Sequence, residues 1–92
     1  MYTPTPIDTS RICLPEELIA LSEKIAENVH DTWALGRLNE GWTYGKQRND
    51  QRRETPCLVP YSQLSEAEKA YDRNTAEETI KVILAMGFKI IK

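Results

Sequence analysis

NVHDTWALGRLNEGWTYGKQRNDQRRETPCLVPY, residues 28–61, runs from a helical pattern into a long segment that has none. Residue types that favour turns interrupt that segment five times: Gly45, Asn49, Asp50, Pro56 and Pro60. Connections longer than about 12 to 15 residues inside a compact domain are usually functional. The stretch therefore predicts two helical regions joined by a long loop, and places the candidate functional side chains in and beside that loop.

A long helix is predicted before this loop. Pro15 suits the first helical position, because its missing N–H would have no partner there anyway. Glu16 and Glu17 favour the positive end of the helix dipole. Gly41 is the best available C-cap, so the helix should end there. Apolar residues recur at helical spacing and predict one stripe: Leu18, Leu21, Ile25, Val29, Trp33 and Leu38.

A second helical region is predicted after the loop. Ser65 and Glu68 spell the S-x-x-E capping box, which predicts a short helix that ends near Asp72. Asn74 and Glu77 repeat this pattern, and begin the second long helix or continue the first piece after a kink. The apolar side of this helix is expected to hold Ile80, Val82, Ile83, Leu84 and Met86.

Two short segments have β propensity. Gly87 should end the second long helix, and Phe88–Ile91 after it could pair with Cys57–Val59. The prolines on both sides of the latter would confine it to an edge. The expected fold is mainly α, with two long helices and a short helix, a long proline-bounded loop and at most a small two-stranded β ribbon.

The size of the chain limits its organisation. With 92 residues and 40% apolar content, it has room for one domain with one modest core. Residues 1–13 contain Pro4 and Pro6 among Thr and Ser and show no apolar period, so they are expected to form an extended arm. Residues 14–92 are expected to form the single domain.

The charge and hydropathy pattern argues against several classes of partner. A net charge of −2 and a pI of about 5.4 argue against a nucleic-acid-binding domain, which usually has a clear basic excess. No apolar run approaches the roughly 18 residues of a membrane span. The first ten residues, MYTPTPIDTS, lack the regions of a signal peptide. A cytoplasmic protein with no membrane association is therefore expected.

The sequence shows no catalytic or metal-binding pattern. Cys13 and Cys57 belong to no C-x-x-C motif and are expected to be reduced thiols, so no metal site and no cofactor are predicted. His30 and Asp31 are adjacent on a helix and do not face each other, so they cannot form a dyad. A nucleophilic pair of Cys57 and His30 would need convergence that the sequence does not show. We expect His30 to make a structural hydrogen bond and the protein to be no enzyme.

Several stretches of this sequence together resemble a known family. Residues 28–61, together with AEN at 26–28 and SEAEKAYDRNTAEETIKVILAMGF at 65–88, closely resemble the RyR domain. This repeat is named for the ryanodine receptors and also occurs alone in microbial proteins. The resemblance covers roughly Leu14 to Ile90, and PCLVPY at 56–61 matches a family element almost residue for residue. Since the family is not an enzyme family, the resemblance implies a binding module and no reaction.

The resemblance also implies an arrangement and a ligand. The channels carry the repeat as tandem pairs about a pseudo-two-fold axis, so a single copy is expected to form a homodimer. Residues 30–33 match the H-x-x-W motif of the channel repeats. There the tryptophan looks like part of a cleft between the two tandem copies, in which a purine nucleotide could lie. Trp33 is then either a core anchor or a stacking surface, and stacking contributes about 1 to 3 kcal/mol per base.

The remaining candidates lie around the loop. Arg37 and Arg48 could hold a phosphate or a partner carboxylate, although charged loop residues are more often simply solvated. Trp42 and Tyr44 are expected to fold back on the helix as a structural lock. The candidate ligand site thus comprises Trp33, Arg37, Trp42, Tyr44 and Arg48. A structural adaptor that docks on another protein and binds no small molecule stays open as the alternative.

Overall fold

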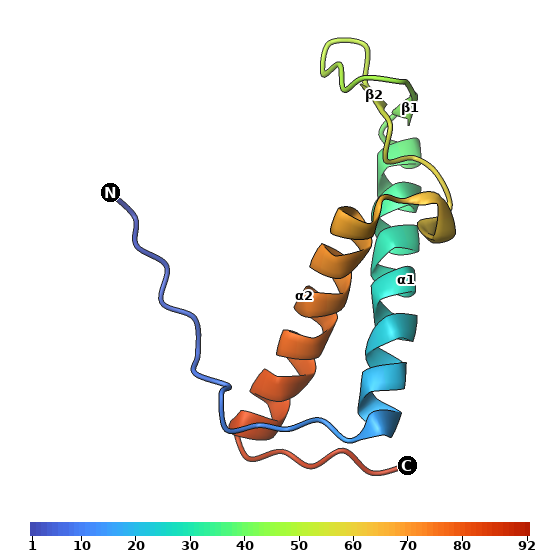
Figure 1. Cartoon of the computed structure of the whole chain (residues 1–92). Helices are drawn as coiled ribbons and strands as arrows, with labels where there is room; N and C mark the ends of the chain where they lie inside the picture. The colour runs from blue at the N-terminus through green and yellow to red at the C-terminus, as the bar shows by residue number, and fades with distance from the viewer.

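The computed structural model describes residues 1–92 and consists of two long antiparallel helices with a folded connection (Figure 1). The helices are α1, Glu16–Asn39, and α2, Glu66–Ala85. The connection contains β1, Thr43–Tyr44, β2, Glu54–Thr55, and a short 3-10 helix η1, Tyr61–Gln63. The mainly α fold with a small two-stranded ribbon is confirmed. The short helix expected from Ser65 to Asp72 is not a separate element but the first part of α2, and η1 was not predicted.

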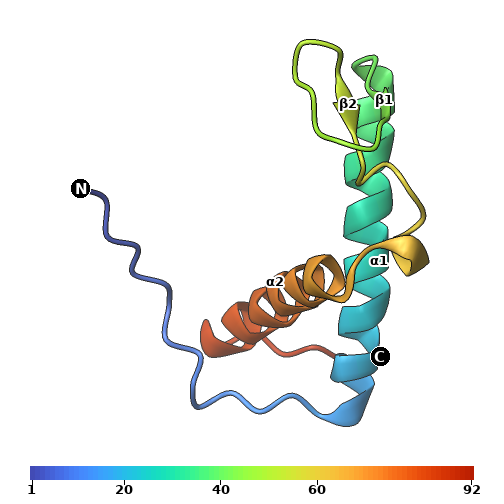
Figure 2. The same ribbon diagram turned by 45° about the horizontal axis from the view of Figure 1, so that its top comes forward.

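The two helices form a V (Figures 1 and 2). Its open end lies at the start of α1 and the end of α2, where the N-terminal and C-terminal segments join the helices. The last turns of α1 extend past the start of α2, and the loop with the ribbon sits on them. The part of α1 beyond α2 is therefore covered by the loop alone. Neither helix has both the length and the apolar character needed to cross a membrane.

The predicted ends of α1 are correct to within two residues. Pro15 stands at the N-cap position with extended backbone, and Glu16 and Glu17 occupy the first turn. Gly41 has a φ of 89°, a conformation that lets the chain reverse directly after the helix.

The predicted break in the second helical region is wrong. Ser65 caps α2 as expected, since its Oγ accepts from the Glu68 N–H at 3.2 Å. The helix then continues through Asn74 without interruption. Ala76 and Ile80 are buried beyond that point, so packing against α1 holds the chain helical where a second cap was expected.

The stripe that α1 buries is not the one expected from its apolar residues. The buried positions are Ser22, Ala26 and His30, one turn apart. Ala26 is fully buried and Ala76 of α2 is 2% exposed, so small residues lie where the helices approach each other. Ser22 is satisfied because its hydroxyl donates to the Leu18 carbonyl. The larger residues of the expected stripe are half-buried, as at Leu18, Ile25 and Trp33, or exposed, as at Leu21, Val29 and Leu38.

Tyr61 fills the space between the helices from the side of the loop. The residue is 6% exposed and packs with Ala26 and Ala76. Its hydroxyl donates to Glu23 Oε1 at 3.3 Å, and Arg73 Nε donates to the other oxygen of that carboxylate at 2.6 Å. The PCLVPY segment therefore ties the loop to both helices. Arg73 thereby connects α2 to α1.

The buried tyrosine predicts a loss of stability in alkali. Burial first, and then the Glu23 carboxylate, raise the pKa of Tyr61 above its ordinary value of 10.0, while Arg73 opposes the shift. As the pH rises past 10, the unfolded chain releases this proton before the folded one does, so folding loses free energy. We expect the urea midpoint to fall more steeply between pH 9 and 11 in the wild type than in Tyr61→Phe. Parallel curves for the two proteins would contradict this origin.

The β ribbon forms between segments other than those expected. β1 and β2 pair in parallel, with Thr43 opposite Glu54 and Tyr44 opposite Thr55. The expected pairing of Cys57–Val59 with Phe88–Ile91 is wrong, since neither segment is a strand. They lie near opposite ends of α2, whose 20 residues separate them by about 30 Å.

The N-terminal residues contain no helix or strand, and the first of them extend away from the body (Figure 1). The segment then crosses beneath both helices. Thr9 Oγ1 donates to Glu78 Oε2 of α2 at 2.8 Å, and Leu14 is buried. The arm is thus attached at its second half.

Candidate functional site

Four of the five predicted site residues stack in one column, which we call the Arg–Trp ladder: Trp33, Arg37, Trp42 and Arg48. The Arg37 Cζ lies 5.7 Å from the ring centroid of Trp33 and 4.9 Å from that of Trp42. The Arg48 Cζ lies 5.6 Å from the Trp42 centroid. These distances fall in the range of cation–π attraction.

His30 continues the column into the core. Its ring stacks on Trp33 with centroids 5.6 Å apart and planes at 26°. His30 and Arg37 stand on α1 one turn before and one turn after Trp33, so the indole has a stacking neighbour toward each end of the helix. The His30 Nε2 lies 2.7 Å from the Val59 carbonyl oxygen. Trp33 is therefore half-buried, with an aromatic partner on its core side and a guanidinium on its loop side.

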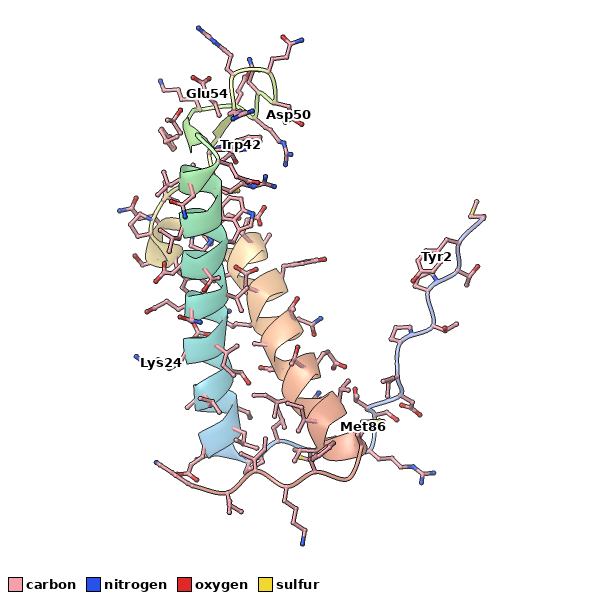
Figure 3. All side chains as sticks on the ribbon, turned by 180° about the vertical axis from the view of Figure 1, so that it is seen from behind. Tyr2, Lys24, Trp42, Asp50, Glu54 and Met86 are labelled. Atoms are coloured by element: carbon pink, nitrogen blue, oxygen red, sulfur yellow. The ribbon has the colours of Figure 1, made fainter.

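The turn after α1 brings Trp42 back onto the helix. Gly41 reverses the chain, and the Trp42 N–H then donates to the Arg37 carbonyl at 3.0 Å. Arg53 Nη1 donates to the Glu40 carbonyl at the end of α1 at 2.6 Å. Trp42 accordingly lies at the junction of helix and loop, below the tip that carries Asp50 (Figure 3). The expectation that this aromatic folds back onto its helix is confirmed.

Each guanidinium of the ladder also has a carboxylate partner. Arg37 Nη1 lies 3.3 Å from Glu40 Oε1, and Arg48 Nε lies 2.8 Å from Asp50 Oδ1. The hydrogen bond from Arg48 holds the pKa of Asp50 below its ordinary value. The carboxylates are exposed, and exposed ion pairs contribute only about 0 to 1 kcal/mol. An incoming anion can therefore replace either carboxylate at small cost.

Tyr44, the fifth predicted residue, lies apart from the ladder. It borders a shallow hollow of about 490 Å³, the Leu38 hollow, between α1 and the proline-bounded segment. The apolar residues around this hollow are Ala34, Leu38, Tyr44, Leu58, Val59 and Pro60. Leu38 and Tyr44 are 55% and 56% exposed. The structure thus brings together four of the site residues and gives the fifth to a separate apolar surface.

A second hollow was not anticipated from the sequence. It has a volume of about 300 Å³ and lies between α1, the loop and the first turns of α2. Its polar and aromatic residues are His30, Trp33, Cys57, Glu68, Tyr71 and Asp72, and we call it the acid–aromatic hollow. The spacing of Glu68, Tyr71 and Asp72 already places them on one helical face, but only the tertiary structure sets that face opposite Trp33.

Cys57 and His30 both border this hollow, yet they form no nucleophile–base pair. The His30 Nε2 is engaged by the Val59 carbonyl, and the structure contains no hydrogen bond between the ring and the thiol. Cys13 and Cys57 are both free, and Cys13 is exposed. No three His, Cys, Asp or Glu side chains gather in a way that would hold a metal ion.

Arg37 is expected to stabilise the protein through its contacts with the two indoles. Replacing Arg37 by Ala removes two cation–π contacts, so we expect a loss of about 1 to 2 kcal/mol and a red shift of the tryptophan emission. Arg37→Lys should recover little, because an ammonium lacks the planar face that stacks between two indoles.

Arg52→Ala is the matched control for this change. It removes an exposed guanidinium that forms no ion pair from the neighbouring loop, and should change stability by less than about 0.5 kcal/mol. Urea unfolding followed by fluorescence measures all three variants. Equal unfolding midpoints for Arg37→Ala and Arg52→Ala would show that the stacking contributes nothing.

The family comparison agrees with the sequence resemblance. The family model of the RyR domain matches residues 2–92, which is all but the first residue of the chain. The match thus includes the N-terminal arm as well as the helices and the loop.

Proposed function

Because the chain belongs to the RyR domain family, we propose that it is a non-catalytic binding module that acts as a homodimer and receives a small planar anion, such as a purine nucleotide, at the Arg–Trp ladder. The observation that carries the proposal is the ladder itself. It presents the indoles of Trp33 and Trp42 and the guanidinium groups of Arg37 and Arg48 at the end of α1 and in the loop that follows it.

The chemistry of the ladder suits such a ligand. A purine base would stack on the Trp42 ring in place of the Arg48 guanidinium, and Arg48 would turn from Asp50 to a phosphate. Stacking contributes about 1 to 3 kcal/mol per base. The exposed ion pair that is given up is worth no more than about 1 kcal/mol. Arginine also binds phosphate in the same bidentate geometry that it uses with carboxylates.

The homodimer rests on the apolar surface beside the ladder. Leu35 is 61% exposed, and Leu38 and Tyr44 are exposed to a similar degree. A small domain that leaves large apolar side chains in water gains by covering them, and symmetric dimers are the commonest way. In such a dimer, the Leu38 hollows would form the contact and the ladders would flank it. We expect the module to act in the cytoplasm, where its two thiols stay reduced.

Two measurements test the proposal. Sedimentation velocity should give a dimer for the wild type and a monomer for Leu38→Glu, because a buried carboxylate would oppose the apolar contact. ATP or ADP should quench tryptophan fluorescence, and Arg48→Gln should weaken this effect about tenfold. Arg52→Gln, which removes an equal charge from the same loop, should leave the affinity within about twofold.

A structural adaptor without a small ligand is the second candidate. It is favoured by the fact that both indoles already have stacking partners, so the ladder is complete as a lock for the loop. No quenching by any purine nucleotide, together with an intact dimer, would favour the adaptor. A monomer that also fails to bind nucleotides would contradict the dimer and the ligand together.

A further inference from the structure

The acid–aromatic hollow has a polar lining that attracts positive charge. Glu68 and Asp72 stand one turn apart on α2 and border the hollow together. Neither forms an ion pair, although other acids near them do: Glu66 pairs with Lys69, and Glu23 pairs with Arg73. Like charges at this spacing destabilise a helix by a few tenths of a kcal/mol. A cation between the two carboxylates would remove that repulsion.

His30 is almost completely buried, with 5% of its surface exposed. Its Nε2 must carry the hydrogen, because the Val59 carbonyl oxygen 2.7 Å away can only accept. The Nδ1 of the neutral ring is then an acceptor, and the structure gives it no partner. Since no side-chain nitrogen or oxygen is both fully buried and unpaired, Nδ1 keeps contact with solvent. His30 borders the hollow, so we infer that Nδ1 contacts solvent there.

Aromatic side chains complete the lining. Tyr71 is 75% exposed and has no stacking partner, so its ring face is free for a cation. Trp33 forms the opposite wall and already carries one guanidinium, that of Arg37, on its loop side. The hollow thus offers two unpaired carboxylates, a free imidazole lone pair and a ring face. No Lys or Arg side chain borders it.

We propose that the acid–aromatic hollow is a binding site for an organic cation, a guanidinium or alkylammonium group on a short apolar stem. The charged head would lie between Glu68 and Asp72 and donate to His30 Nδ1. The stem would contact Val29 and Leu64, which also border the hollow. This site shares Trp33 with the ladder, but it differs in the charge that it accepts and in its other polar residues, His30, Glu68, Tyr71 and Asp72. The cation can be a free amine or the Arg or Lys side chain of another protein.

The site is tested by NMR titration of the full chain with n-butylguanidinium, and with n-butylurea as a neutral molecule of the same shape. The two tryptophans serve as internal probes. We expect butylguanidinium to shift the Trp33 indole resonance and leave that of Trp42 in place, and butylurea to shift neither. Equal shifts with both compounds, or shifts at Trp42 alone, would overturn the proposal. Nucleotide binding at the ladder would instead move Trp42, so either site can fail without the other.

Variants assign the binding to the named groups. Glu68→Gln and Asp72→Asn should each weaken butylguanidinium binding roughly tenfold, as expected for a hydrogen bond to a charged group. Tyr71→Ala, at an exposed position, should weaken it about threefold. Glu66→Gln removes the same charge from the same helical turn but away from the hollow, and should have no effect. If Glu66→Gln matches the other two acid variants, the attraction is only the general negative charge of α2.

Two peptides separate the sources of the cation. One is acetyl-Leu-Arg-Leu-amide, and the other has citrulline, the neutral urea analogue, in place of Arg. Preference for the Arg peptide over free butylguanidinium would assign the site to a partner's side chain. Binding of butylguanidinium with no binding of the peptide would assign it to a free small-molecule cation. Failure of both cations to bind would refute the site.

Discussion

Tyr61→Ala is expected to remove a large share of the protein's stability, about 3 to 5 kcal/mol at room temperature. A ring this deeply buried, packed between Ala26 and Ala76, has few neighbours able to fill the space that it leaves. Truncating a buried aromatic side chain to Ala costs about 3 to 5 kcal/mol. A chain of this length has about 5 to 14 kcal/mol of stability in all.

Circular dichroism and urea unfolding at a fixed protein concentration measure the effect of Tyr61→Ala. Tyr61→Phe is the control, because it keeps the ring and loses only the hydrogen bond to Glu23. That bond should contribute about 0.5 to 1.5 kcal/mol. If Tyr61→Ala costs no more than Tyr61→Phe, the ring is not the centre of the core.

His30→Ala is expected to lower the stability by about 2 to 3 kcal/mol. The change leaves the Val59 carbonyl without its donor, and an unsatisfied half-buried acceptor costs about 1 to 3 kcal/mol. It also removes the ring that stacks on Trp33. The tryptophan emission should therefore shift to the red in the folded protein.

His30→Gln separates the two contributions, because its amide can still donate to the Val59 carbonyl while the ring is lost. We expect it to recover about 1 kcal/mol relative to Ala. Urea unfolding with an unchanged slope would show that both changes act on stability alone. Equal losses for Ala and Gln would mean that only the volume of the ring matters. A loss below about 0.5 kcal/mol for Ala would place His30 outside the core.

Local chemistry in the sequence located the helix ends and the loop well. The Ser65 cap, the acidic first turn of α1 and the turn at Gly41 each depend on a few neighbouring residues, and all three occur in the structure. The grouping of Trp33 with Arg37 follows in the same way, since the two stand one helical turn apart.

The features that the sequence did not predict lie where distant segments meet. Apolar periodicity pointed to Val29 and its neighbours as the buried stripe, but the helices pack through Ala26 and Ala76, because small side chains allow the closest approach. The break expected at Asn74 is absent because the residues beyond it are buried against α1. The ribbon pairs β1 with β2, since the segments that were expected to pair end up on opposite ends of α2.

The sequence by itself determined two helices, their caps, the long loop and membership of a family, because each is encoded in a motif of contiguous residues. The tertiary structure alone decided that Arg48 returns to the ladder, that Tyr44 leaves it, and that Glu68 and Asp72 face Trp33 and His30. Those placements depend on how the loop folds back over α1 and how α2 packs against α1. They result from long-range packing that no local spacing of residues specifies.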